Sequence, residues 1–267
     1  MRSESIARIR RTLRTSTAAA AKRTVSIRKR RRRESAPDKP QKPERAGPKG
    51  WVKTIVGYGT AFVVIHLFLF RTFVIDSGSM ENTLLVGDYL VVNQMAMGGR
   101  IPFTEISIPG YADPHHGDIV VFDPHHEDNM FIVKRVVGLP GDTLQMQGRI
   151  LYRNGVVQDE PYVVTGPEPD VHDPNMRWQQ RILLGGPRDD YHPTRDTWGP
   201  LVVPEGHYFL LGDNRNESLD SRIWGSLERW RIRGRVGFIY FSYNRDSTRP
   251  FPFVREIRVD RIFQRPS

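Results

Sequence analysis

The sequence predicts a mainly β protein in which a disordered basic tail and one transmembrane helix precede an antiparallel β domain. Two observations carry this prediction. After Arg71, short runs of β-branched and aromatic residues recur between Gly, Pro and Asp residues, which is typical of strands and turns. Before Arg71, a long apolar stretch follows a Pro-, Lys- and Glu-rich segment with hardly an apolar residue. No long amphipathic helical pattern competes after Arg71, so the folded part is expected to be built from β-sheet.

Residues 1–50 are expected to form a disordered, basic cytoplasmic tail. They contain 17 Lys and Arg against 4 Asp and Glu, a net charge of +13, whereas residues 51–267 contain 23 against 26. The segment 34–50 has too few apolar residues to bury a core. Such a tail could be a nucleic-acid-binding arm, or a flank that orients a membrane span and touches anionic lipid. The apolar stretch directly after it favours the flank, so plasma-membrane lipid is the expected partner and nucleic acid is not.

Residues 51–71 are expected to cross the plasma membrane once. About 20 apolar residues are needed to cross the hydrocarbon core as a helix, and this stretch is just long enough. A cleaved leader is the competing interpretation, but a fifty-residue basic leader is too long and no small-x-small site precedes Ser77. The excess of Lys and Arg before the span keeps that side in the cytoplasm. Residues 72–267 are therefore expected to form an exported catalytic β domain.

The strands expected in this domain lie at 72–75, 89–93, 118–122, 130–137, 143–146, 149–153, 207–211 and 235–243. Asn154-Gly155 is typical of a two-residue hairpin turn. From about 158 to 200 the chain is rich in Pro, Asp, Gly and Arg and weakly periodic, which indicates an inserted, looser subdomain or a long loop. The chain has no cysteine, which excludes disulfides, thiol catalysis and cysteine metal sites.

Three separated segments contain residues that suggest catalysis. Lys134 stands among β-branched residues of a predicted strand, where burial would lower its pKa enough for the neutral amine to act as a base. Taken alone, such a lysine more often extends its ammonium group to water. However, two serine-containing segments accompany it, Ser77-Gly78-Ser79-Met80 just after the apolar stretch and residues 212–222, which include Ser218. Serine, lysine and a second serine are the groups that a Ser/Lys hydrolase requires.

Together with Gly117-Asp118-Ile119-Val120-Val121-Phe122, these segments follow the order found in bacterial type I signal peptidases, and the chain resembles this family from about residue 73 to 224. The resemblance implies a membrane-anchored serine endopeptidase that removes signal peptides from exported preproteins and uses no cofactor or metal ion. It implies that Ser79 is the nucleophile, that Lys134 is the general base, and that the Ser77 hydroxyl lies in the oxyanion hole. The other implied residues support the lysine: Ser218 orients it, and Asp220 and Arg222 form a structural pair.

The same resemblance implies pockets for small P1 and P3 residues of an Ala-x-Ala signal. The residues implied to flank them are Ile75, Asp76, Met80, Leu84, Ile132 and Val133. The chain departs from the family at two positions, because Asp76 and Asn82 replace its usual prolines. Proline restricts the backbone before folding, so without it more conformational entropy is lost when the site is ordered, and the site is expected to be looser. A carboxylate at Asp76 would also favour the ammonium form of Lys134 if the two groups came close.

Several alternatives stay open. A membrane-tethered β domain that binds peptides or partner proteins with weakened catalysis is suggested only by the two departures. A relative of the self-cleaving SOS repressors would share Ser/Lys chemistry, but it would need a DNA-binding domain in place of the tail and span. The pairs His115-His116 and His125-His126 stand near acidic residues, but adjacent strand residues point to opposite faces and no HExxH spacing occurs, so we expect solvated loop residues. His207 could act in a Ser-His-Asp triad, although its spacing does not single it out.

Overall fold

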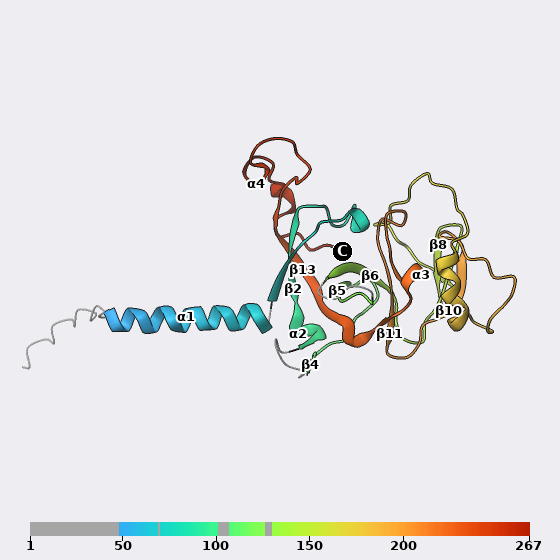
Figure 1. Cartoon of the computed structure of the whole chain (residues 1–267), viewed down its shortest axis with the longest axis horizontal. Coiled ribbons are helices and arrows are strands. Elements are labelled where there is room, and N and C mark those ends of the chain that lie inside the picture. The colour runs from blue at the N-terminus through green and yellow to red at the C-terminus, as the bar shows by residue number, and fades with distance from the viewer. Residues whose placement is uncertain (1–47, 69, 101–106, 126–129) are drawn as a thin grey trace, which may run out of the picture. The chain divides into compact units, whose positions relative to one another are not determined.

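The computed structural model describes residues 48–68, 70–100, 107–125 and 130–267. The chain divides into two units, residues 1–51 and 52–267, and the sheets belong to the second unit (Figure 1). The tail predicted for residues 1–50 lies almost entirely outside the described residues.

Helix α1 (Pro48–Phe68) covers most of the predicted membrane span. Its described apolar side chains are exposed; they include Trp51, Val52, Ile55, Val56 and Phe62. Over the described part of the chain, no helix combines the length and the hydropathy that a membrane crossing requires. The span at 51–71 therefore stays a prediction from the sequence.

The larger sheet has seven strands in the order β1-β2-β13-β5-β6-β11-β12, and every neighbouring pair is antiparallel. Its strands are β1 (Phe70–Val74), β2 (Asp88–Asn93), β5 (Ile119–Phe122), β6 (Ile132–Gly138), β11 (His207–Leu211), β12 (Leu227–Glu228) and β13 (Ile232–Ser242). The long strand β13 pairs with β2 on one side and β5 on the other, and shifts of register along it bend the sheet (Figure 1). The predicted fold class, mainly β with antiparallel sheets, is confirmed.

A second, four-stranded sheet has the order β10-β7-β8-β9. Its strands are β7 (Thr143–Gln147), β8 (Ile150–Arg153), β9 (Val156–Val157) and β10 (Trp198–Val202). Asn154 and Gly155 connect β8 to β9 with φ of 55° and 77°, the left-handed values that a type I′ hairpin turn requires, so the predicted turn is confirmed. A two-stranded ribbon, β3 (Gly98–Arg100) with β4 (Ser107–Pro109), forms a separate sheet, and β3 contacts β13 of the larger sheet.

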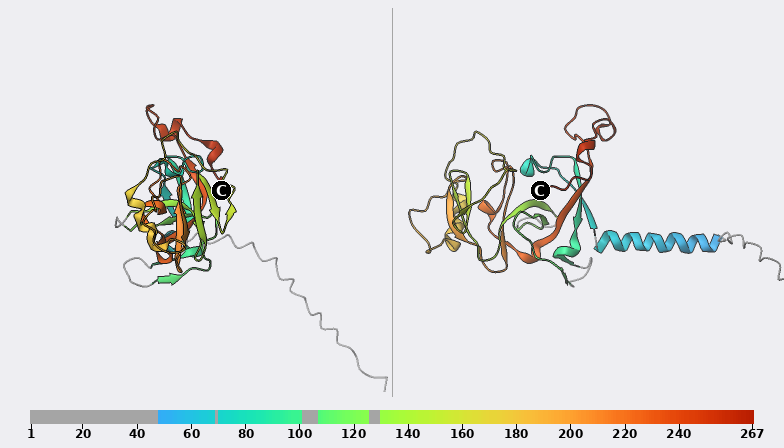
Figure 2. Two further views of the ribbon diagram at one scale, coloured as in Figure 1. Left: turned by 90° about the vertical axis from the view of Figure 1, so that its right-hand side faces the viewer. Right: turned by 180° about the vertical axis from the view of Figure 1, so that it is seen from behind.

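The helices after α1 are short. They are α2 (Gln94–Met97), α3 (Ser221–Trp224) and α4 (Pro252–Arg255), with single 3-10 segments at η1 (Gly78–Met80), η2 (Pro174–Ile182), η3 (Arg229–Arg231) and η4 (Val259–Arg261). Helix α3 contacts η2, which in turn contacts β10, so these elements lie together beside the smaller sheet (Figure 2).

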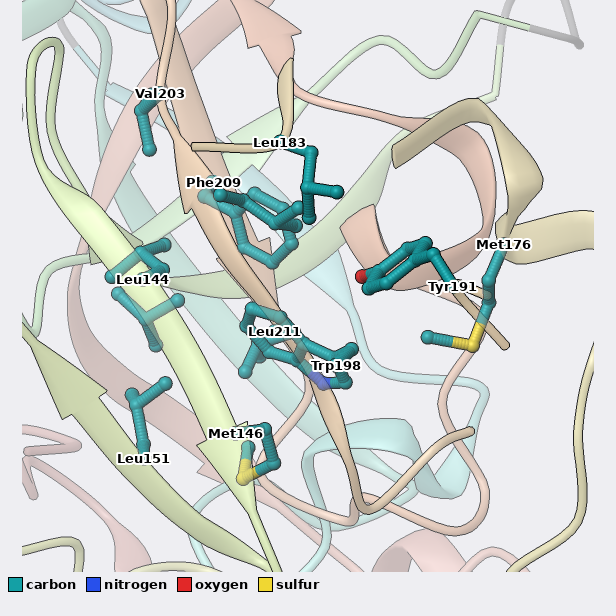
Figure 3. Close-up of a cluster of buried hydrophobic side chains, with 12 residues drawn as sticks. Leu144, Met146, Leu151, Met176, Leu183, Tyr191, Trp198, Val203, Phe209 and Leu211 are labelled. Carbon is teal, nitrogen blue, oxygen red and sulfur yellow. The ribbon is translucent and has the colours of Figure 1, made fainter. Parts of the chain in front are cut away.

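Three clusters of buried apolar side chains form the core. The first lies between the smaller sheet and β11, where the Trp198 and Phe209 rings stack with centroids 5.3 Å apart (Figure 3). Met176 and Tyr191 join this cluster, so the Pro- and Gly-rich segment at 158–200 contributes to the core although it contains little regular structure.

The second cluster packs beneath η1, and it includes Met80 and Leu84 together with Leu90, Ile119 and Ile239. The third cluster includes Phe122, Val136 and Leu210. Met80 is 1% exposed and Leu84 0% exposed, and burial of such side chains contributes roughly 1.5–3 kcal/mol each. The turn that contains Ser79 is therefore attached to the core on its C-terminal side.

Candidate active site

Ser79 lies in the 3-10 turn η1, which begins after the extended residue Ser77 (φ −130°). The backbone N–H of Asn214 donates a hydrogen bond to the Ser79 carbonyl oxygen at 3.1 Å. Together with burial of Met80, this bond fixes the turn from two sides. Residue Ser79 is 8% exposed, so it lies at the edge of the core rather than in open solvent.

Lys134 lies on β6 in the interior of the larger sheet, paired with Val120 of β5. Its Nζ donates a hydrogen bond to Ser79 Oγ at 2.7 Å and another to the Val133 carbonyl oxygen at 3.1 Å. Only 3% of the residue is exposed. Because the residue is buried and its Nζ bonds to Ser79 and Val133, the amine does not extend to water as the solvated interpretation of the sequence required.

Burial lowers the pKa of Lys134 to about 8, although the carboxylates of Asp220 and Asp213 act in the opposite direction and Arg222 acts in the same one. A free lysine is almost wholly protonated at neutral pH, whereas a pKa of about 8 leaves this amine neutral in roughly one tenth of molecules at pH 7. Asp76 is exposed, and the charges that act on Lys134 are those of Asp220, Asp213 and Arg222. The expected interference of Asp76 with the lysine is therefore not seen.

The Ser77 hydroxyl oxygen lies 3.5 Å from Ser79 Oγ, and Ser77 is exposed. A hydroxyl beside the nucleophile and open to solvent can donate a hydrogen bond to a bound ligand. The assignment of Ser77 to an oxyanion hole depends on such a ligand and stays a prediction.

Asp220 and Arg222 meet as a buried pair at the N-terminus of α3. Arg222 Nε and Nη2 donate to the Asp220 carboxylate at 2.8 and 2.7 Å, and the Gly212 N–H donates to it at 3.1 Å. Burial alone would raise the pKa of Asp220, but Arg222 holds the pKa below its ordinary value, so the carboxylate stays ionised. This pair fixes the course of the chain between Gly212 and α3.

Ser218 is not bonded to the lysine. Its buried hydroxyl acts on Asp220, whose pKa it helps to lower, while Lys134 Nζ bonds to Ser79 and Val133. The segment is nevertheless packed closely at this point. A Cβ added to Gly212 would overlap Ser218 Oγ and would lie 2.6 Å from the Ser79 carbonyl oxygen. The lysine-orienting role of Ser218 stays a prediction.

The residues implied to flank the substrate pockets differ in their surroundings. Ile75, Met80 and Leu84 are buried in the second cluster, Val133 packs against it, and Ile132 packs against the third cluster. Asp76 is exposed. The pocket assignment needs a bound peptide to test it and stays a prediction.

The departure from proline at Asn82 has a backbone explanation. Asn82 has φ of 80°, in the left-handed region that asparagine tolerates and proline cannot adopt. Its side-chain amide also donates to the Tyr162 carbonyl oxygen at 3.2 Å. Asparagine therefore fits this turn and ties it to another segment, so the chain is not simply looser here.

Sequence reasoning missed an ion pair beside the lysine. Arg135 Nε and Nη2 donate to Asp213 Oδ1 and Oδ2 at 2.8 and 2.6 Å, and both side chains are at most 3% exposed. Thr83 Oγ1 donates to Asp213 as well, at 2.5 Å. A signal for this pair was present, because a second cation directly after Lys134 in an apolar strand requires a buried anion.

The histidines that the sequence suggested, where the structure describes them, have partners outside the site residues. His116 contacts Asp142 at 2.6 Å, His125 lies 3.4 Å from Glu228, and His207 Nδ1 bonds to the Glu205 main chain. His126 lies outside the described residues.

The model of the family described as "Signal peptidase, peptidase S26" matches residues 49–241, a range that contains every candidate site residue. The chain is similar to Signal peptidase I of Pseudomonas aeruginosa, with 38% identity over 184 residues, or 64% of this chain and 63% of that protein. Signal peptidase I of Pseudomonas fluorescens is 36% identical over 183 residues, again 64% of this chain and 63% of that protein. Signal peptidase I of Bacillus licheniformis is 33% identical over 195 residues, or 73% of this chain and 89% of that protein. The chain thus matches a little under two thirds of the length of the two Pseudomonas proteins and most of the Bacillus protein.

Proposed function

The chain belongs to the signal peptidase family, peptidase S26, and on this premise we propose that it is a serine endopeptidase that removes N-terminal signal peptides from exported preproteins. The observation that carries the proposal is the 2.7 Å contact between Lys134 Nζ and Ser79 Oγ. A serine needs a base to act as a nucleophile, and a buried lysine with a pKa of about 8 can be that base near neutral pH.

In the first step Ser79 Oγ attacks the carbonyl carbon of the scissile peptide bond while its proton passes to Lys134 Nζ. The resulting ammonium group then gives this proton to the leaving amine as the C–N bond breaks. The mature protein leaves, and the signal peptide stays attached to Ser79 as an ester. In the second step Lys134 takes a proton from water, the hydroxide formed attacks the ester, and the proton returns to Ser79 Oγ.

The negative oxygen of each tetrahedral intermediate needs hydrogen-bond donors. We assign this role to the Ser77 hydroxyl and the backbone N–H of Ser79, supported by the 3.5 Å separation of the two hydroxyls and the solvent access of Ser77. Such donors act on charge that develops in the transition state, so they affect kcat more than KM.

Substrates are proposed to carry small residues at P1 and P3, of the Ala-x-Ala type. An extended peptide that adds to a strand edge beside Ser79 would gain main-chain hydrogen bonds and present alternate side chains to the pockets. A large or charged P1 residue would clash or lose its hydration in a pocket bounded by buried side chains such as Met80 and Leu84.

We further propose that residues 51–71 anchor the protein in the plasma membrane, with residues 1–50 in the cytoplasm and the catalytic domain outside. The net charge of +13 before the span supports this orientation, and the exposed apolar side chains of α1 support burial in lipid. The proposed partners are accordingly signal peptides and plasma-membrane lipid.

The alternative of a peptide-binding domain with weakened catalysis is not favoured. It was suggested by Asp76 and Asn82, yet Asp76 is exposed and Asn82 occupies a backbone conformation closed to proline. Neither departure interrupts the contact between Ser79 and Lys134.

The test is to incubate the purified full chain with a preprotein and to map the new N-terminus by mass spectrometry. We expect one cut after a small residue that follows the apolar segment of the signal, and no cut by the Ser79→Ala variant. Efficient cleavage after Arg or Phe, or unchanged cleavage by Ser79→Ala, would contradict the proposal.

A further inference from the structure

The buried Arg135–Asp213 pair stands directly beside the catalytic residues. Arg135 follows Lys134 on β6, and Asp213 precedes Asn214, whose N–H bonds to the Ser79 carbonyl oxygen. A buried ion pair requires close geometry and a full set of hydrogen bonds, because loss of one partner leaves an uncompensated charge. A contact that holds Arg135 on Asp213 therefore affects the charge and the water around Lys134.

One face of the pair is covered by the segment 160–164, which the sequence assigned to an insertion or loop. The Tyr162 ring lies on the Arg135 guanidinium, with Cζ 3.7 Å from the ring centroid. This is close for a cation–π contact, and the ring also excludes water from the pair.

The same segment is bonded along the 213–215 stretch. Val164 N donates to the Asp213 carbonyl oxygen and Arg215 N donates to the Val164 carbonyl oxygen, both at 2.9 Å, so Val164 and Asn214 form a parallel β-bridge. Glu160 accepts from Arg215 Nη2 at 2.6 Å, and both side chains are less than 10% exposed. Tyr162 OH donates to Glu160 at 3.2 Å.

A third attachment joins this segment to the nucleophile turn, since Asn82 Nδ2 donates to the Tyr162 carbonyl oxygen. The segment thus contacts each of the three stretches that hold the catalytic pair: the turn after Ser79, the strand of Lys134 and the 213–215 stretch.

We propose that residues 160–164 form a strap that closes the Arg135–Asp213 pair and thereby positions Lys134 against Ser79, with Tyr162 as the positioning residue. The inference rests on the proposed function and adds a structural part to it. Tyr162 does not transfer protons in this role. Burial raises the pKa of its phenol, against smaller effects of Arg135 and Arg215, so the group stays neutral in the working range.

The direction of the effect on Lys134 follows from the charges around it. Asp213 and Asp220 favour its ammonium form, while burial and Arg222 oppose that form. If the ring is removed, water reaches the pair and Arg135 is less firmly held on Asp213. Weaker neutralisation of Asp213 by Arg135 stabilises the ammonium form of Lys134, so the limb along which activity rises with pH should move to higher pH.

The experiment compares wild type, Tyr162→Ala, Tyr162→Leu, Tyr162→Phe and Tyr208→Ala as full chains on one preprotein across pH. Tyr208 is a matched control, because it is a buried tyrosine of the third cluster on β11.

Tyr162→Ala should lose roughly 3- to 30-fold in kcat/KM at neutral pH, the range of a partly buried cation–π contact. The midpoint of the limb along which its activity rises with pH should move up by about half a pH unit or more. Tyr162→Leu should show the same upward shift, because it fills space without a π face. Tyr162→Phe should stay near wild type, and Tyr208→Ala should lower Tm without moving the limb.

A second readout does not depend on turnover: the pH titration of the ¹³C-labelled Lys134 ε-methylene by NMR, which should shift upward in Tyr162→Ala and Tyr162→Leu. If these variants are folded but titrate like wild type, the strap has no positioning role. If Tyr162→Phe is as impaired as Tyr162→Ala, the hydroxyl acts rather than the ring, and the proposal is overturned. Absence of preprotein cleavage by wild type would contradict the proposed function instead, while the lysine titration would still decide on the strap.

Discussion

At the scale of the residue, the chemistry depends on a lysine whose burial opposes folding. Lowering the pKa of Lys134 from 10.5 to about 8 corresponds to roughly 3 kcal/mol of disfavoured ammonium form at neutral pH. The unfolded chain binds a proton here up to pH about 10.5, whereas the folded chain releases it near pH 8. The destabilisation of the folded state is therefore fully present below pH 8 and disappears as pH rises from 8 to 10.5.

Lys134→Met should consequently abolish cleavage and stabilise the fold. At pH 7 we expect its free energy of unfolding to exceed that of wild type by about 1–3 kcal/mol, less than the full cost because the hydrogen bond to Ser79 is lost. The difference should shrink between pH 8 and 10.5. Urea unfolding at a series of pH values measures it, with Ser79→Ala as the control that keeps the lysine. A variant less stable than wild type at pH 7 would show that Lys134 is not destabilised by burial.

Asn82 leads to a second residue-scale prediction. Asn82→Pro would introduce the residue usual in the family, but φ of 80° cannot be adopted by the ring, so we expect destabilisation by about 3 kcal/mol or more. Asn82→Gly accepts the same φ and should stay within about 1 kcal/mol of wild type. Chemical denaturation of both variants decides the matter, and a stabilised Asn82→Pro protein would refute the backbone explanation.

The sequence allowed the buried lysine to be predicted only with the two serine-containing segments beside it, because the apolar strand around Lys134 taken alone favours an ammonium group that reaches water. It indicated that Arg135 needs a buried anion, but it did not identify Asp213 as that anion, since the partners are 78 positions apart and only the tertiary fold joins them. For the same reason the contact of Tyr162 with Arg135 was not predicted, because only the composition of the segment around Tyr162 could be used.

At the scale of the element, runs of β-branched and aromatic residues between turn residues were enough to predict most strands. Every predicted strand is found, with its ends moved by three residues or fewer, and the Asn154-Gly155 hairpin has the expected turn. Strand β10 was missed because Trp198-Gly199-Pro200 resembles a loop, and tertiary pairing with β7 forms this strand despite a register shift. The short strands β3, β4 and β12 contain too few residues to show a period.

Gly212 tests the packing between elements. It lies where the stretch after β11 passes the nucleophile turn, and a Cβ there would meet Ser218 Oγ and the Ser79 carbonyl oxygen. Gly212→Ala should destabilise the protein by about 1–3 kcal/mol and lower kcat by tenfold or more, because Ser79 or Ser218 must move. Gly59→Ala is the matched control: this position on α1 has open space around its Cβ, so stability and kcat should be kept or slightly improved. Equal kcat in the two variants would show that the approach of these segments does not matter for catalysis.

At the scale of the whole molecule, charge is divided between the tail and the folded part. The tail carries +13 and the rest −3, so the sequence pI near 10.1 describes the tail rather than the catalytic domain. From this asymmetry the sequence predicts orientation, but the described residues neither include most of the tail nor contain a helix that meets the requirements for a span. Orientation is therefore tested by experiment.

A protease added outside intact protoplasts should digest the chain after Arg71 and spare residues 1–50, which an antibody against the tail would detect as a protected fragment. This result follows from the positive charge kept on the cytoplasmic side. Protection of the C-terminal part with loss of the tail would invert the topology and contradict the proposed work on exported preproteins.

The central claim is that neutral Lys134 takes the proton of Ser79, and the most direct test is the pH dependence of kcat/KM for wild type and Lys134→Arg on one preprotein. The kcat/KM of wild type should rise with pH and level off above a midpoint near pH 8, well below the value of a free lysine, because kcat/KM reports the pKa of the base in the free enzyme. Lys134→Arg should be as inactive as Lys134→Ala at every pH, since guanidinium keeps its charge and cannot accept the proton. Near-wild-type turnover by Lys134→Arg would contradict the account and would show that another group, such as His207, is the base.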